Sequence, residues 1–234
     1  MKRVPHEAAR SDRAAAARQR GPVVHVVDDD PSFLRAVSRR LEAAGFDVEA
    51  FGSAEAFLAR RSHLPGCVVV DLRLKGQSGL DLQDADAAAD DPLPLVFLSG
   101  HGDVHSSVRA MKRGAVDFLT KPVSGGDLID AVRRAIALDA GARADREAYR
   151  ELRRRYERLT PREREVFALV ARGLLNKQIA AELGTSERTI KAHRARVMEK
   201  MGAQSVTDLT RSAERLRTAP ASGHALRAGR APQG

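Results

Sequence analysis

Four short apolar runs in the first half of the chain each end in a side chain that can take part in phosphoryl chemistry. The polar groups that close these runs are Asp28, Asp29 and Asp30, then Asp71, then Ser99, and finally Lys121. Apolar runs of this length predict buried strands. The C-terminal ends of parallel strands meet along one edge of a sheet, where such folds build their sites. We therefore expect acids, a hydroxyl and an amine to converge at that edge.

These residue types fit the capture of a phosphoryl group. A carboxylate can form an acyl phosphate, which makes Asp71 the expected nucleophile. Asp28 and Asp29, together with Asp71, offer the hard oxygen ligands that Mg²⁺ prefers, and the metal would offset charge on the phosphoryl oxygens. Lys121 would pair with another phosphoryl oxygen, and Ser99 would donate a hydrogen bond to the captured group.

A simpler explanation covers each position taken alone, because turns after strands favour polar residues. It is much weaker for all four positions in this order. Asp30 differs from its two neighbours because it precedes Pro31. A proline at the first helical position predicts that Asp30 caps a helix rather than binding a metal.

Residues 22 to about 140 resemble the receiver domain of bacterial two-component response regulators. The resemblance rests on the segments HVVDDDPSFL, VVVDLRL, FLSGHGDV and GAVDFLTKP and on their separations. It implies an α/β fold, namely a flavodoxin-like five-stranded parallel sheet wrapped by five helices. It also implies that a sensor histidine kinase phosphorylates Asp71 to 4-aspartylphosphate.

The resemblance assigns further roles. Phe118 corresponds to the switch aromatic, which turns inward when the Ser99 hydroxyl moves toward the phosphoryl group; an ordinary core phenylalanine is the alternative. Arg73 would give only its backbone carbonyl to the metal. The Lys121-Pro122 bond resembles one that the family often holds in cis. Lys75 is a departure, because the family usually has proline there, and this leaves the rigidity of the loop and the lifetime of the phosphoryl group open.

Composition sets the class of protein. A chain of 234 residues holds one or two domains, and 30% charged residues with no Trp indicate a soluble protein with modest cores. The single cysteine, Cys67, excludes an internal disulfide framework and suits a reducing cytoplasm. No apolar stretch approaches the length of a membrane span, and the basic N-terminus lacks the apolar core of a secretory signal.

Charge is distributed unevenly. Residues 22–140 hold 13 Lys and Arg against 18 Asp and Glu, whereas residues 141–234 hold 21 against 11. An acidic first half joined to a basic second half indicates a regulator coupled to a nucleic-acid-binding domain. The predicted order is a disordered basic leader at 1–21, the receiver at 22–138, a helical linker at 139–158, a DNA-binding domain at 159–217 and a disordered tail at 218–234.

The second half carries its own helix signals. Thr160, Pro161 and Glu163 have the form of a capping box with proline at the first helical position, and Gly173 is a natural stop. Asn176 is the expected cap of a short helix. After a turn at 184–186, in which Ser186 is the expected cap, a longer helix is expected from residue 187 to 201. Two helices joined by a short glycine-containing turn predict a helix-turn-helix.

The longer helix has two faces. Ile190, Val197 and Met201 are expected to pack inward. The opposite face gathers basic and small residues near its N-terminal end, namely Arg188, Lys191, Ala192, Arg194 and Ala195. That is the end a recognition helix presents to base edges in the major groove. A solvated basic face is the alternative, but the helix-turn-helix context favours DNA recognition.

The segment LTPREREVFALVARGLLNKQIAAELGTSERTIKAHRARVMEKMGA resembles the LuxR-type, or NarL-type, DNA-binding domain. This resemblance implies an all-α module of four helices that closes with a helix at about 205–217, and it places Lys191 and Ala192 against bases. The family usually has a larger residue at Ala192, so base preference stays open. The expected contacts to the DNA backbone are Asn176, Lys177, Thr189, His193, Arg194 and Arg196. His193 fits a structural role equally well.

The two-part layout most resembles the FixJ-type response regulators. The resemblance implies a transcription factor whose phosphorylation promotes homodimerisation and binding to double-stranded promoter DNA, with RNA polymerase as a further partner. No enzyme activity is expected beyond self-catalysed phosphoryl transfer and slow autodephosphorylation, since nothing resembles a nucleotide-binding loop. The alternative is a transcription factor whose receiver is a dimerisation or docking module that does not respond to phosphate.

Overall fold

The computed structural model describes residues 21–62, 64–89, 91–100 and 104–218. The leader and tail expected from the sequence lie outside these residues, apart from Gly21 and Thr218 at their edges. The described chain forms two compact units that divide between residues 141 and 142.

The first unit alternates strands and helices. Its elements are β1 (Val23–Val27), α2 (Pro31–Ala43), β2 (Asp47–Phe51), α3 (Ala54–Arg60), β3 (Gly66–Asp71), α4 (Gly79–Ala87), β4 (Leu95–Ser99), α5 (Val104–Lys112), β5 (Asp117–Thr120) and the start of α6 (Gly125–Glu157). The strands form one parallel sheet in the order β2-β1-β3-β4-β5. The predicted flavodoxin-like receiver fold is therefore confirmed.

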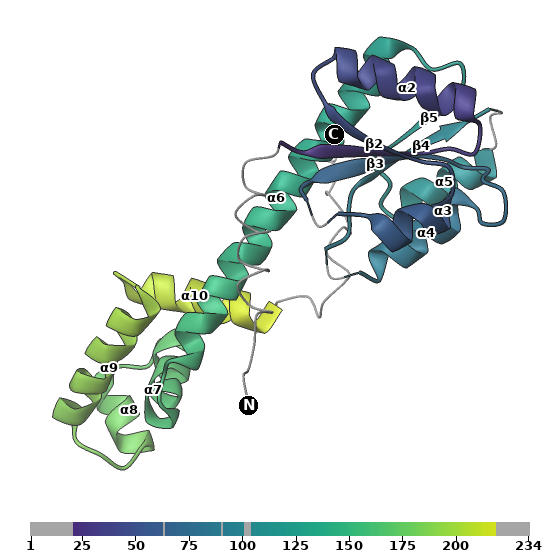
Figure 1. The fold of residues 1–234 in the computed structure, drawn as a ribbon. Coiled ribbons are helices and arrows are strands. Elements are labelled where there is room, and N and C mark those ends of the chain that lie inside the picture. Colours follow the sequence, from purple (N-terminus) through teal and green to yellow (C-terminus); the bar gives the residue numbers. More distant parts are fainter. Residues whose placement is uncertain (1–20, 63, 90, 101–103, 219–234) are drawn as a thin grey trace, which may run out of the picture. The chain divides into compact units, whose positions relative to one another are not determined.

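Strand residues alternate between two apolar clusters. In β3, Val68 and Val70 face the layer that contains α3, α4 and α5, whereas Cys67 and Val69 face α2 and the start of α6. Figure 1 shows these helices on opposite faces of the sheet. Because both faces are covered, the central strands are continuous apolar runs, as parallel sheets require.

The loops after β1 and β3 are fixed by helix caps. The Asp30 carboxylate accepts hydrogen bonds from the amides of Ser32 and Phe33, and Pro31 is the first residue of α2. This confirms the predicted role of Asp30 as a cap. The loop after β3 ends at α4, where Ser78 and Asp81 form a reciprocal capping box.

The helix α6 is a single element of 33 residues. The sequence predicts a helical linker at 139–158, and in the structure residues 139–157 are helical and continue the last receiver helix. Residues 142–157 contain no proline or glycine, and Arg153–Glu157 and Arg155–Glu151 pairs support the helix at i,i+4 spacing.

Asp139, which was expected in the linker, is buried in the first unit. Its carboxylate accepts a hydrogen bond of 2.9 Å from the amide of Gly66, the first residue of β3. A Cβ on Gly66 would lie 1.9 Å from the carbonyl oxygen of Val23. Only glycine therefore lets β3 begin this close to β1.

The second unit consists of the end of α6, α7 (Pro161–Ala171), α8 (Asn176–Glu182), α9 (Glu187–Met201) and α10 (Val206–Thr218). Ile190, Val197 and Met201 of α9 are buried as predicted, in a cluster against which the partly buried Leu152 and Tyr156 of α6 pack. The capping box at Thr160 and the cap at Ser186 are present. The predicted helix-turn-helix is confirmed.

One predicted cap is wrong. The cap of α8 is Leu175, which contributes no side-chain cap hydrogen bond, and Asn176 is the first helical residue. The Gln178 side chain instead accepts a hydrogen bond of 2.8 Å from the Leu175 amide. The Asn176 oxygen accepts a hydrogen bond of 3.0 Å from Arg194 on α9, so this side chain joins the two helices of the motif. Among the described residues, no helix has the length and apolar character of a membrane span.

His25 is an unusual residue for the middle of a buried strand. Its side chain is fully buried between the rings of Phe51 and Phe57, and its Nε2 lies 3.4 Å from a carboxylate oxygen of Glu49. Burial lowers the pKa of His25 below its ordinary value of 6.5, and the attraction of Glu49 only partly offsets this effect. The folded protein therefore favours the neutral imidazole.

We expect His25 to make the receiver less stable as pH falls through 6.5. The unfolded chain then takes up a proton that the folded state resists, so the free energy of unfolding decreases until the folded pKa is reached. Chemical denaturation between pH 7.5 and 5 measures this slope. His25→Val removes this contribution, whereas His105→Gln, at an exposed residue of α5, keeps it. An unchanged slope in His25→Val would show that other groups control the pH dependence.

Candidate functional site

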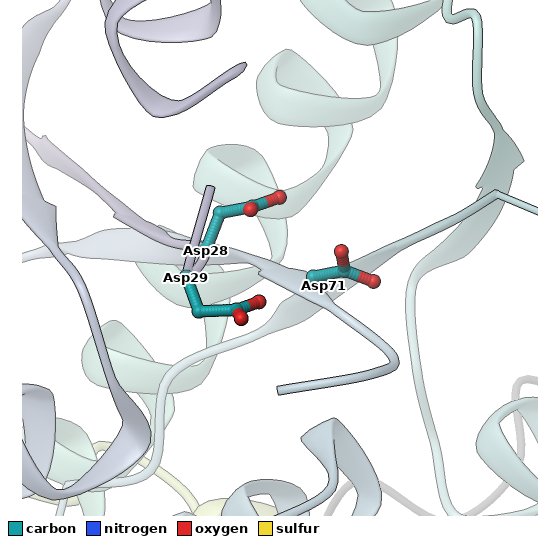
Figure 2. Close-up of side chains that lie close together, drawn as sticks. All are labelled: Asp28, Asp29 and Asp71. Carbon is teal, nitrogen blue, oxygen red and sulfur yellow. The ribbon is translucent and has the colours of Figure 1, made fainter. Parts of the chain in front are cut away.

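The three carboxylates singled out in the sequence meet at the C-terminal edge of the sheet. Asp28 and Asp29 directly follow β1, and Asp71 is the last residue of the neighbouring strand β3. Figure 2 shows the three side chains gathered there, and one oxygen from each lies within 4.8 Å of the others. The register explains the meeting, because Val27 pairs with Val70 and the next residues carry the acids.

Lys121 joins two of these acids. Its Nζ donates hydrogen bonds of 2.6 Å to Asp28 and to Asp71. Burial raises the pKa of Asp28, against the effects of Lys121 and of the Asp30 amide. Burial alone would lower the pKa of Lys121, but its bonds to Asp28 and Asp71 outweigh burial and raise it. The ammonium form is thus favoured beside the acids.

The backbone around Asp71 fixes the direction of its carboxylate. One oxygen accepts from Lys121, and the other accepts a hydrogen bond of 3.0 Å from the amide of Arg73. Arg73 and Ser78 form an isolated bridge that closes the loop. At the start of α4, a Cβ on Gly79 would lie 2.5 Å from the Asp71 carbonyl oxygen, so glycine allows α4 to approach the back of this strand end.

Ser99 and Phe118 lie on the two strands beyond β3. Ser99 is buried at the end of β4, and its carbonyl accepts a hydrogen bond of 2.7 Å from the Lys121 amide. Phe118 on β5 is half-buried and stacks on Phe97 with ring centroids 6.3 Å apart. The Lys121-Pro122 bond is cis, as the resemblance implied.

Two contacts at this site were not anticipated from the sequence. Lys75 places its Nζ 3.2 Å from an Asp29 oxygen, while its own side chain is 86% exposed. The ring of Phe33 lies 3.8 Å from the Lys121 Nζ, measured to the ring centroid. The sequence marked Lys75 as a departure from the usual proline, but nothing in the pattern named its partner. No sequence signal marked Phe33.

The acid cluster has the chemistry of a hard-cation site. Three carboxylates crowd together, and in the described part of the chain only two side-chain cations, Lys75 and Lys121, form salt bridges with them. The three negative charges thus exceed the two positive ones by one. A divalent cation with oxygen ligands relieves the remaining repulsion, so the residues fit Mg²⁺.

The second candidate site is the outer face of the helix-turn-helix. Its exposed members are Lys177, Arg188, Thr189, Lys191, Ala192 and Arg196. Arg194 and Asn176 are half-buried and bonded to each other. His193 is half-buried, and its Nδ1 has no hydrogen-bond partner among the described residues. The exposed cations and hydroxyl suit contacts to phosphates and base edges.

Family comparisons agree with both halves. The model described as "Response regulator receiver domain" matches residues 24–133, and that described as "Bacterial regulatory proteins, luxR family" matches residues 157–213. A receiver fold with an acid cluster, followed by a helix-turn-helix, defines a DNA-binding response regulator.

Relatives match this chain over most of its length. Nodulation protein W of Bradyrhizobium diazoefficiens is 46% identical over 197 residues, covering 83% of this chain and 86% of that protein. Transcriptional regulatory protein FixJ of the same organism is 40% identical over 193 residues, covering 82% and 94%. The solved structure of the response regulator StyR is 43% identical in sequence and superposes with a TM-score of 0.74. The match covers 84% of this chain and 100% of the StyR chain. The chain belongs to the FixJ-like branch of the NarL/LuxR-type two-component response regulators, which regulate transcription.

Lys75→Gln is expected to tighten Mg²⁺ binding, because Lys75 neutralises the carboxylate of Asp29, one of the three acids that could hold the metal. The exposed position limits the effect to about two- to fivefold, and added salt reduces it. Titration calorimetry of the unphosphorylated protein measures the change. Arg39→Gln, which removes one positive charge from the exposed side of α2, serves as the control. Equal affinities in Lys75→Gln and wild type at low salt would show that Lys75 does not compete with the metal.

Proposed function

We propose that Asp71 is the phosphoacceptor of this response regulator and that its donor is a phosphohistidine on a cognate sensor kinase. An Asp71 oxygen attacks the phosphorus, a P–O bond forms, and the P–N bond to the kinase histidine breaks. The observation that carries this assignment is the Asp71 carboxylate, which lies next to Asp28 and Asp29 and accepts a 2.6 Å hydrogen bond from Lys121.

The other residues of the site act on charge and position. Asp28, Asp29, Asp71 and the Arg73 carbonyl would hold Mg²⁺, which when bound offsets charge on the phosphoryl oxygens. Lys121 exchanges its bond to Asp71 for one to a phosphoryl oxygen. The site promotes its own phosphorylation and slow dephosphorylation, without further enzyme activity.

Phosphorylation is read out through Ser99 and Phe118. The Ser99 hydroxyl moves toward the captured group, and the half-buried ring of Phe118 turns into the space that the hydroxyl leaves. Ser99 is the last residue of β4 and Phe118 lies in β5, and both strands lie next to α5. The movement of these two side chains therefore alters the surface formed by α5, β5 and the start of α6.

That surface is the proposed dimer interface. It carries charges of both signs, namely Arg109, Lys112, Arg113, Asp117 and Asp127, which suits self-complementary pairing across a two-fold axis. Dimerisation brings two recognition helices to two half-sites of the DNA. Once one helix is bound, binding of the other is effectively intramolecular, which strengthens binding of the dimer. The proposed partners are promoter DNA and RNA polymerase, and the proposed location is the cytoplasm.

A phosphoryl mimic tests the acceptor and the dimer together. Beryllofluoride with Mg²⁺ is expected to convert wild type from monomer to dimer in sedimentation and to strengthen binding to the DNA upstream of its own gene. Asp71→Asn keeps the shape but lacks the nucleophilic carboxylate, so it is expected to respond in neither assay. An equal response of the variant would rule out Asp71.

The same data separate the alternatives. Wild type that stays monomeric at micromolar concentration, yet binds DNA better with the mimic, would replace dimerisation by release of a masked DNA-binding domain. Wild type that binds DNA equally with and without the mimic, although labelled by a phosphodonor, would favour a receiver that serves only for docking.

Lys191 and Arg196 are expected to differ in what they read. Lys191→Ala should weaken binding to the preferred site by about 1–3 kcal/mol, as loss of a base contact does, and leave random DNA nearly unaffected. Arg196→Ala should weaken both DNAs and reduce the salt slope by about one, as loss of a phosphate contact does. Fluorescence anisotropy over a salt series measures both. Equal losses on the two DNAs would make Lys191 a phosphate contact.

A further inference from the structure

Lys121 has a third neighbour besides its two carboxylates. Its Nζ lies 3.8 Å from the centroid of the Phe33 ring while donating to Asp28 and Asp71 at 2.6 Å. A cation this close to an aromatic face is attracted by the ring quadrupole, and more strongly where water is excluded. The Lys121 side chain is only 18% exposed, so exclusion of water is substantial.

The position of the ring is set by α2. Phe33 is the third residue of that helix, and its amide donates to the Asp30 cap at 3.3 Å. The ring also packs against the apolar cluster between α2, the sheet and α6. The acid loop and the ring that covers Lys121 are therefore fixed by one helix terminus.

An aromatic face suits a lysine that must meet an incoming anion. A long lysine side chain is flexible and loses rotamer freedom when it is held in one geometry. A further carboxylate would hold it but would repel the phosphoryl oxygens. A neutral ring attracts the ammonium without adding negative charge, so Lys121 stays directed at the acceptor and remains able to exchange Asp71 for a phosphoryl oxygen.

We propose that Phe33 is a positioning residue for phosphorylation, acting through a cation–π contact with Lys121. The inference rests on the proposed roles of Asp71 and Lys121. Its contribution is to keep the Lys121 ammonium at the acceptor both before and after the phosphoryl group arrives.

Fluorination of the Phe33 ring tests the cation–π contact directly, because it changes the charge distribution of the ring and hardly alters its shape. Phe33 is replaced by phenylalanines with one, two and three ring fluorines, which progressively weaken the quadrupole, and phosphorylation by phosphoramidate with saturating Mg²⁺ is followed by mass. The rate constant is expected to fall stepwise with each fluorine, by about three- to tenfold over the series. Phe33→Leu is expected to lower the rate constant at least as much as the trifluorinated ring does. Phe33→Trp, which keeps an aromatic face, is expected to keep the wild-type rate.

Two controls separate positioning from packing. The same substitutions at Phe46, which packs against the same cluster, are expected to leave the rate unchanged. In a Lys121→Gln background the fluorine series at Phe33 is expected to be flat. Thermal unfolding confirms that the variants are folded.

Rates that do not change along the Phe33 series in otherwise wild-type protein would overturn the proposal, as would a fluorine dependence that persists without Lys121. Failure of wild type itself to become phosphorylated, or equal phosphorylation of Asp71→Asn, would instead overturn the proposed function on which it rests.

Discussion

Repulsion among three carboxylates at one edge of the sheet is the constraint on which the rest of the receiver depends. The parallel register brings Asp28, Asp29 and Asp71 together, and unbalanced acids there oppose folding. The chain offsets this repulsion with Lys121 and Lys75. Both cations lie where a metal and a phosphoryl group are expected to act, so the contacts of the unphosphorylated protein must be exchanged during function. Under the proposed function, phosphorylation therefore replaces the interactions that stabilise the site.

The fold was largely readable from the sequence because its signals are local. Apolar runs ending in polar groups located four of the five strands, all except β2, and the strand ends then determined which side chains converge. Caps were equally local, as Asp30, Thr160 and Ser186 show. Asn176 was misassigned because it has the residue type of a cap, whereas the structure uses its oxygen to bind Arg194 across the motif. Tertiary partners of this kind leave no trace in spacing.

The candidate site was also predictable only as far as local sequence signals reach. The convergence of the three acids and Lys121 was predicted correctly because the strand order fixes which strand ends lie side by side. The contacts of Lys75 with Asp29 and of Phe33 with Lys121 depend on how segments far apart in the sequence approach each other, which no single segment encodes. His25 was likewise unremarkable within an apolar run, and only burial between Phe51 and Phe57 reveals its effect on stability.

The helix α6 changes what counts as a separable module. Leu152 and Tyr156 pack against the core of the second unit, and the Arg155 guanidinium donates to the carbonyl of Met201 at the end of α9. A DNA-binding fragment cut at residue 159, where the sequence pattern begins, would lose these groups. When the receiver of such a protein is replaced by another receiver, the second half of α6 therefore has to stay with the DNA-binding domain. The two parts are then best joined inside this helix rather than in a loop.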